Sequence, residues 1–98
     1  MSQASVRELF YPTGELLSRM ELIDDVPNGL LERWHISGLL TLRANLLNGE
    51  YHGQYDSWWD NGQPKESGEY KHDKKFGVYR WYKNTGELWS EQDCGGEP

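Results

Sequence analysis

The stretch Tyr55–Glu91, YDSWWDNGQPKESGEYKHDKKFGVYRWYKNTGELWSE, decides the fold because its second part repeats the pattern of its first. Trp58 stands four residues before Gly62, and 24 residues later Tyr82 stands four residues before Gly86. A fixed period between about 20 and 50 residues is typical of repeat proteins. We therefore expect a repeat architecture, which presents a surface more often than it encloses an active site.

The same period extends to the N-terminal half of the chain. Two sets of glycines follow it, namely Gly14, Gly38, Gly62 and Gly86, and Gly29, Gly53 and Gly77. An aromatic column stands four residues before the first set and consists of Phe10, Trp34, Trp58 and Tyr82. We expect one domain over residues 1–98, with repeat units at about 6–29, 30–53, 54–77 and 78–93 and loose tails at 1–5 and 94–98.

Each unit is predicted to form a strand, a tight turn, a second strand and a longer turn. A glycine every 9 or 15 residues, with β-branched and aromatic residues between, disfavours helix. Both glycine sets are assigned to turns because glycine tolerates the backbone conformation that tight hairpins need. The predicted fold is all-β, an elongated antiparallel β-meander of four 24-residue hairpin repeats with about eight strands.

The alternation of side chains predicts how these strands pack. The aromatic column is interpreted as the core, so its neighbours Tyr11 and Trp59 should be exposed on the other face. A charged column precedes the aromatic column by two residues, which would put both on one face; its members are Glu8, Glu32, Asp56 and Arg80. This conflict predicts a bulge or a twist between the two columns.

The charge balance bounds the possible partners. The chain has 16 acidic and 10 basic residues and a net charge of −6, with no cluster of Lys and Arg. This balance disfavours nucleic acid and anionic membrane surfaces as partners. Residues 48–71 carry five acidic residues against two lysines, a net charge of −3. Such a surface attracts basic partners, although ordinary solubility charge is an alternative interpretation.

No pattern of catalytic or metal-binding residues emerges. His35, His52 and His72 are 17 and 20 residues apart, and the single Cys94 occupies a column of apolar residues. We expect no metal site, no cofactor and no enzymatic activity. The chain lacks an apolar N-terminal segment and a run of about 20 apolar residues, which favours a cytoplasmic protein.

Paired aromatic residues stand before Asn and Gly, as in Trp58-Trp59-Asp60-Asn61-Gly62, and this motif is similar to that of a known repeat family. Together with Gly68-Glu69-Tyr70 and Phe76-Gly77, they resemble the MORN-repeat family, in the variant form common in bacterial proteins, over residues 6–93. Units one and two fit less well, since Pro12-Thr13, Leu39, Met20 and Ala44 depart from the pattern. The resemblance implies stacked hairpins. It also implies a role in protein–protein interaction, scaffolding or lipid contact, and bacterial members are often antitoxin or immunity components.

The surplus aromatic residues provide the candidate binding site. We predict that Trp59, Trp81 and Trp89 anchor a protein partner, since tryptophan is enriched at binding hot spots. Asp56, Asp60 and Glu66 would complement a basic partner such as a toxin. The alternatives are that these rings merely cover the second face of the sheet, that the protein is a scaffold or homodimer joined through its sheet edges, or that it contacts lipid.

Overall fold

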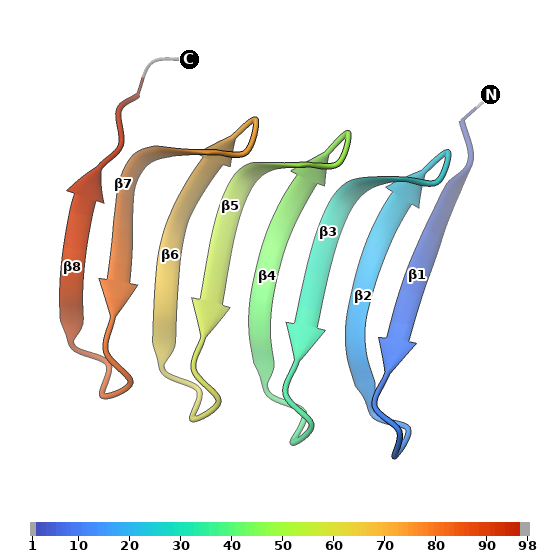
Figure 1. Ribbon diagram of the computed structural model, residues 1–98, viewed down its shortest axis with the longest axis horizontal. Coiled ribbons are helices and arrows are strands. Elements are labelled where there is room, and N and C mark those ends of the chain that lie inside the picture. The colour runs from blue at the N-terminus through green and yellow to red at the C-terminus, as the bar shows by residue number, and fades with distance from the viewer. Residues whose placement is uncertain (1, 97–98) are drawn as a thin grey trace.

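The computed structural model describes residues 2–96 and consists of one eight-stranded sheet (Figure 1). The strands are β1 (Ala4–Phe10), β2 (Leu16–Ile23), β3 (Val26–Trp34), β4 (Leu40–Leu47), β5 (Glu50–Trp58), β6 (Pro64–Lys71), β7 (Lys74–Tyr82) and β8 (Leu88–Asp93). They pair in chain order, each antiparallel to the next. The molecule measures 41 × 38 × 11 Å, so it is a single layer. The predicted all-β meander of antiparallel hairpins is confirmed.

The turns that follow the odd-numbered strands share one geometry. In the first, the Gly14 N–H donates to the carbonyl of Tyr11 at 2.9 Å, and the Tyr11 N–H donates to the carbonyl of Glu15 at 2.8 Å. The same two bonds recur in the turns that begin at His35, Trp59 and Lys83. Gly14 has φ of 103°, a value that L side chains rarely adopt. The first glycine set therefore lies in turns, as predicted.

The turns that follow even-numbered strands consist of two residues. Their central pairs are Asp24-Asp25, Asn48-Gly49 and His72-Asp73, and every one of these residues has a positive φ. Two successive residues with positive φ define the type I′ turn, whose twist matches that of the flanking strands. These pairs, and not the second glycine set, close the hairpins at this edge.

The second glycine set was wrongly assigned to turns. Gly29, Gly53 and Gly77 lie inside β3, β5 and β7, again with positive φ. The pairing is irregular there: Met20 is opposite Leu31, whereas Leu22 is opposite Pro27, so β3 holds extra residues. Figure 1 shows β3, β5 and β7 bending sharply near their beginnings. A bulge and a tight turn both require the left-handed backbone that glycine supplies, so periodicity alone could not distinguish them.

A second irregularity lies between the charged and aromatic columns. The register shifts between Leu9 and Phe10, and the equivalent shift recurs before Trp34, Trp58 and Tyr82. At each shift the odd-numbered strand advances by one residue while its partner advances by two, as from Ser18 to Leu16, so the extra residue lies on the even-numbered strand. The predicted bulge is confirmed at this position, on the strand that pairs with the two columns.

The core lies along the middle of one side, which we call the aromatic face. Its buried apolar residues are Leu22, Leu31, Leu42, Ala44 and Tyr79, and four tyrosines, Tyr51, Tyr55, Tyr70 and Tyr79, contact one another there. The aromatic column is not the centre of this core, contrary to expectation: Phe10 is 56% exposed, and Trp34, Trp58 and Tyr82 are half-buried. They lie at the ends of their strands, where fewer neighbours cover them.

The first strand begins earlier than the sequence suggests. Ala4 and Ser5, expected in the N-terminal tail, belong to β1 and pair with Ile23 and Leu22. At the other end, the Cys94 N–H donates to the carbonyl of Gly77 at 2.8 Å. The predicted tails also include residues 1, 97 and 98, which lie outside the described residues.

Candidate functional site

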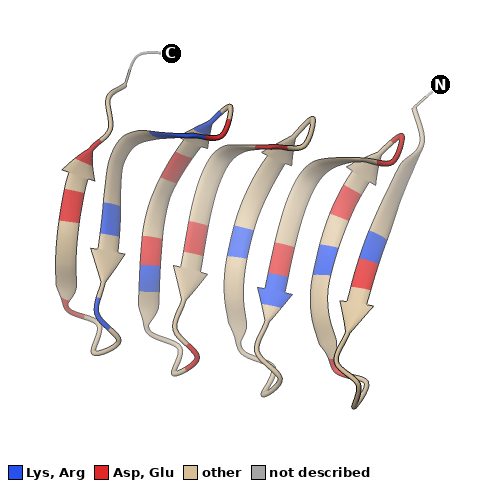
Figure 2. Cartoon of the chain, in the orientation of Figure 1, with Lys and Arg blue, Asp and Glu red and all other residues tan. Residues whose placement is uncertain are grey.

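The side opposite the core carries a row of charged side chains that crosses the whole sheet. Direct strand-to-strand partners connect one residue from each strand, in the order Glu8, Arg19, Glu32, Arg43, Asp56, Ser67, Arg80 and Glu91. We call this row the charge ladder and this side the charged face. Figure 2 shows the alternating red and blue bands on β1 to β5 and on β7 and β8, whereas β6 contributes the uncharged Ser67 to the row. Opposite charges directly across an antiparallel pair stabilise a sheet, so the ladder has a structural role.

The contacts within the charge ladder differ in strength. Arg80 Nε lies 2.8 Å from a carboxylate oxygen of Glu91, whereas Arg19 and Arg43 approach Glu8 and Glu32 only to 3.8 and 3.9 Å. Asp56, a predicted partner-binding residue, accepts a hydrogen bond from the Ser67 hydroxyl at 2.9 Å. The carboxylate of Asp56 is therefore already engaged within the sheet.

Two of the three predicted tryptophan anchors lie together. Trp59 and Trp89 line one surface depression of about 400 Å³ together with Lys83 and Asn84. The Lys65 ammonium lies 4.8 Å from the centre of the Trp59 ring, a cation–π contact. Trp89 lies on β8 and is 68% exposed, the highest value among the exposed large apolar side chains of the described residues. This depression is the strongest candidate for an aromatic contact site.

Trp59 is less exposed than the sequence predicted. It is half-buried, and its indole N–H donates to the carbonyl of Tyr82 at 3.2 Å. Tyr11, predicted exposed for the same reason, is also half-buried, and its hydroxyl donates to the carbonyl of Trp34 at 2.7 Å. Each side chain reaches the matching turn of the next repeat. This column therefore joins neighbouring repeats, because a ring with a polar end can satisfy a carbonyl at a turn.

The third anchor, Trp81, lies on the aromatic face and does not line the depression. Its ring is half-buried and packs against Tyr79 with 4.8 Å between ring centres. Glu66 lies on the same face, where it accepts hydrogen bonds from the Tyr79 hydroxyl at 3.0 Å and from the Ser57 hydroxyl at 3.4 Å. Glu66 is thus a hydrogen-bond acceptor for the core.

The surroundings of these tyrosines disfavour ionisation. Burial, followed by the negative charge of Glu66, raises the pKa of Tyr55 to about 12. The pKa of Tyr79 is also raised, first by burial and then by hydrogen bonding to Tyr70 and the charge of Glu66. Both hydroxyls stay protonated at neutral pH, and the Tyr79 hydroxyl donates a hydrogen bond to the carboxylate of Glu66.

The three predicted acidic contact residues do not form one patch. Asp56 lies on the charged face, Glu66 lies on the aromatic face, and Asp60 is exposed in the turn beside Trp59. Of the six predicted contact residues, Trp59 and Trp89 line the depression, and Asp60 is the chain neighbour of Trp59. Asp56 is opposite Ser67 and Glu66 is opposite Ser57, so strand alternation places these two acids on opposite faces.

A contact between two histidines was not predicted from the sequence. His52 and His72 lie in contact, with 4.7 Å between ring centres, and His72 Nδ1 is 3.1 Å from a carboxylate oxygen of Glu50. Each two-residue turn docks beside the start of the preceding odd-numbered strand, so residues 20 to 22 apart meet there. The spacing of 20 residues was the missed signal. Within residues 2–96, no group of three or more His, Cys, Asp and Glu side chains is placed to hold a metal ion.

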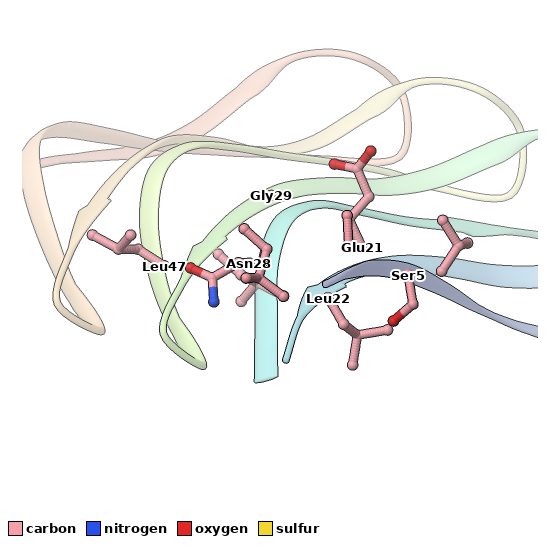
Figure 3. Close-up of a pocket in the computed structure, with 10 residues that line it drawn as sticks. Ser5, Glu21, Leu22, Asn28, Gly29 and Leu47 are labelled. Carbon is pink, nitrogen blue, oxygen red and sulfur yellow. The ribbon is translucent and has the colours of Figure 1, made fainter. Parts of the chain in front are cut away.

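Another hollow lies at the ends of β1 to β4. It has a volume of about 520 Å³ and is lined by Leu22, Leu46 and Leu47 among others. Figure 3 shows Glu21 and Leu22 pointing to opposite sides of the ribbon, so the hollow is a notch at the strand ends. It brings no pair of ionisable groups together over an enclosed volume, as hydrolytic sites require.

Comparisons with known proteins do not add to this description. Searches against protein-family models, curated proteins and solved structures found no match to the chain. The described residues also contain no helix long and apolar enough to cross a membrane.

Proposed function

We propose that this protein is a non-enzymatic binding module that covers a surface of another protein. In its most concrete form, it is a small bacterial antitoxin or immunity-type protein. The observation that carries the proposal is the position of Trp89, which is 68% exposed beside Trp59 on a sheet only 11 Å thick. A large exposed ring that contributes little to its own fold is a typical anchor for a partner.

The shape of the molecule supports contact over a wide area. A single-layer sheet of 41 × 38 Å offers two broad faces, and a stable protein interface needs about 800 Å² from each partner. The net charge of −6 favours a basic partner, such as a nuclease toxin, through faster association. The MORN-like repeat pattern of residues 6–93 supports the same class of function.

The alternative of a scaffold joined end to end receives less support. Continuing the sheet from β8 of one copy to β1 of the next, in the register that joins β2 to β3, places Glu91 opposite Glu8. Like charges directly opposite each other destabilise a sheet. Lipid association is opposed by the same overall acidity.

The proposal is tested by capturing the partner from the native lysate and titrating the purified complex. Trp89→Ala should weaken binding by about thirtyfold or more, the loss typical of a hot-spot tryptophan. Leu88→Ala is the matched control, since Leu88 is also exposed but does not line the depression. If Trp89→Ala and Asp60→Asn both retain full affinity for the captured protein, the proposed contact surface is wrong.

A further inference from the structure

We infer that the open edge of β8 binds an extended basic segment of a partner protein, which adds to the sheet as a further antiparallel strand. This inference rests on the proposed function and specifies the chemistry of the partner. It follows from the backbone at the edge, from the charge of β8 and from the register of the repeats.

The edge offers unpaired backbone groups. Every residue of β8 is exposed, β7 covers one side of it, and among residues 2–96 no strand lies on its other side. In an antiparallel sheet, successive residues direct their N–H and C=O groups toward alternate neighbours. Alternate residues of β8 therefore present donors and acceptors to an incoming strand, which is how strand addition gains its affinity.

The side chains of β8 select a basic guest. The strand carries Glu91 and Asp93 and no Lys or Arg, and Glu87 precedes it in the turn. Glu91 is opposite Arg80 on the charged face, and Asp93, two residues further along β8, shares that face. Arg80 contacts Glu91, yet the Glu91 side chain remains 48% exposed. A lysine or arginine on the guest strand would lie opposite Glu91 and within diagonal reach of Asp93.

The repeat register specifies the residues on either side of that cation. Where β7 pairs with β6, Arg80 is opposite Ser67, and Trp81 is opposite Glu66. A guest in the same register would place its neighbouring side chains opposite Gln92 and Ser90, on the aromatic face. The favoured guest therefore has a basic residue between two large apolar residues, a pattern that β7 itself shows in Tyr79-Arg80-Trp81.

A second copy of this chain is a poor guest. Pairing β8 with β8 would bring two strands together that each hold Glu91 and Asp93 without a basic residue. Pairing β8 with β1 in the repeat register would set Glu91 against Glu8. Acidic residues at the two ends of the charge ladder therefore oppose self-assembly and favour a basic partner.

The first experiment titrates the full chain with a short peptide in which Lys alternates with Val, observed through backbone amide NMR shifts. We expect the amides of β8 to move and those of β1 to stay. Two further peptides carry N-methyl groups on alternate residues, in complementary sets. Since only one parity of guest N–H groups faces β8, one set should abolish binding and the other should preserve it. Shifts spread equally over both edges, or equal loss with both methylated peptides, would overturn the inference.

The second experiment uses matched charge reversals. Glu91→Lys should weaken the peptide affinity by about fivefold or more, because an attraction becomes a repulsion. Glu69→Lys makes the same change of charge on the interior strand β6 and should weaken binding less. Equal weakening by both variants would show that only the overall charge attracts the peptide.

The two proposals can fail separately. If a captured partner protein binds with unchanged affinity to Glu91→Lys, the edge inference fails while the binding-module function stands. If the peptide adds to β8 but no lysate protein binds the chain, the edge inference is supported and the proposed inhibitory function fails.

Discussion

Gly68 lies directly beneath the ring of Tyr79, in the centre of the sheet. A Cβ atom at Gly68 would lie 2.9 Å from Cε2 and 3.0 Å from Cγ of that ring. Tyr79 has no exposed surface, although the sheet is a single layer, because its ring covers the backbone of the neighbouring strand. Because Gly68 has no side chain, the ring of Tyr79, the largest fully buried side chain, can pack directly against the backbone there.

Gly68→Ala should therefore destabilise the protein. Gly68 has ordinary strand φ, so its substitution introduces no backbone strain, and the expected loss of about 1–3 kcal/mol arises from overpacking against Tyr79. Thermal or urea unfolding measures the loss. The double variant Gly68→Ala/Tyr79→Leu should lose less than the sum of the single changes, because the two sites touch. Strict additivity would contradict the proposed contact.

The raised pKa values of the buried tyrosines predict a loss of stability in base. An unfolded tyrosine ionises near pH 10, whereas the pKa of Tyr55 is about 12 in the fold and that of Tyr79 is raised as well. Above pH 10 the unfolded chain releases protons that the folded chain retains, so the free energy of unfolding should fall as pH rises from about 10 to 12. Below that range these two groups contribute no pH dependence.

Urea titrations across this range test the prediction. Tyr79→Phe removes one of the two groups and should make the decline shallower, in addition to the loss of its hydrogen bond with Glu66. A decline of unchanged steepness in Tyr79→Phe would assign the alkaline transition to other residues.

A substitution in the turn at Asp24-Asp25 should increase the stability of the fold. Asp25 has φ of 66°, which costs a non-glycine residue about 1 kcal/mol, while the equivalent position in the next turn is Gly49. Asp25→Gly should stabilise the fold by up to about 1 kcal/mol in thermal unfolding. Asp24→Ala is the opposite case and should destabilise, because Asp24 Oδ1 accepts the N–H of Gln3 at 2.9 Å. If both substitutions shift the unfolding temperature in one direction, the turn assignment is incorrect.

The indole of Trp59 should contribute to stability through the adjacent repeat. Trp59→Phe removes the N–H that donates to the Tyr82 carbonyl, at an expected cost of about 1 kcal/mol. Trp89→Phe should be nearly neutral, because Trp89 is largely exposed. Equal effects of the two substitutions on the unfolding midpoint would remove the distinction between a structural and a partner-contacting tryptophan.

The sequence predicted the topology well because turn glycines and a constant period are local signals. The eight strands and the turns at Gly14, Gly38, Gly62 and Gly86 followed from these signals. The period also revealed the bulge before Trp34, through the clash with the charged residue two positions earlier.

The candidate site was harder to predict because it depends on which face each residue occupies. Strand pairing decides the face: Asp56 is opposite Ser67, whereas Glu66 is opposite the next residue, Ser57, so the two acids lie on opposite faces. The contact between His52 and His72 arises from turn docking, which no property of a single repeat reveals.

The acidic residues at the two ends of the charge ladder, Glu8 and Glu91, lead to a prediction about assembly. In the wild type, head-to-tail addition of copies sets Glu91 against Glu8, so we expect sedimentation to show no growth of end-to-end oligomers with concentration. Glu91→Lys converts that meeting into an attraction and leaves both edge backbones unchanged, so this variant should self-associate as its concentration rises. Added salt should reverse the association, because these charges are exposed. Glu69→Lys, with the same net charge on an interior strand, should remain unassociated. A wild type that already lengthens end to end, or a Glu91→Lys variant that never does, would show that the edge acids do not control which strands this sheet accepts.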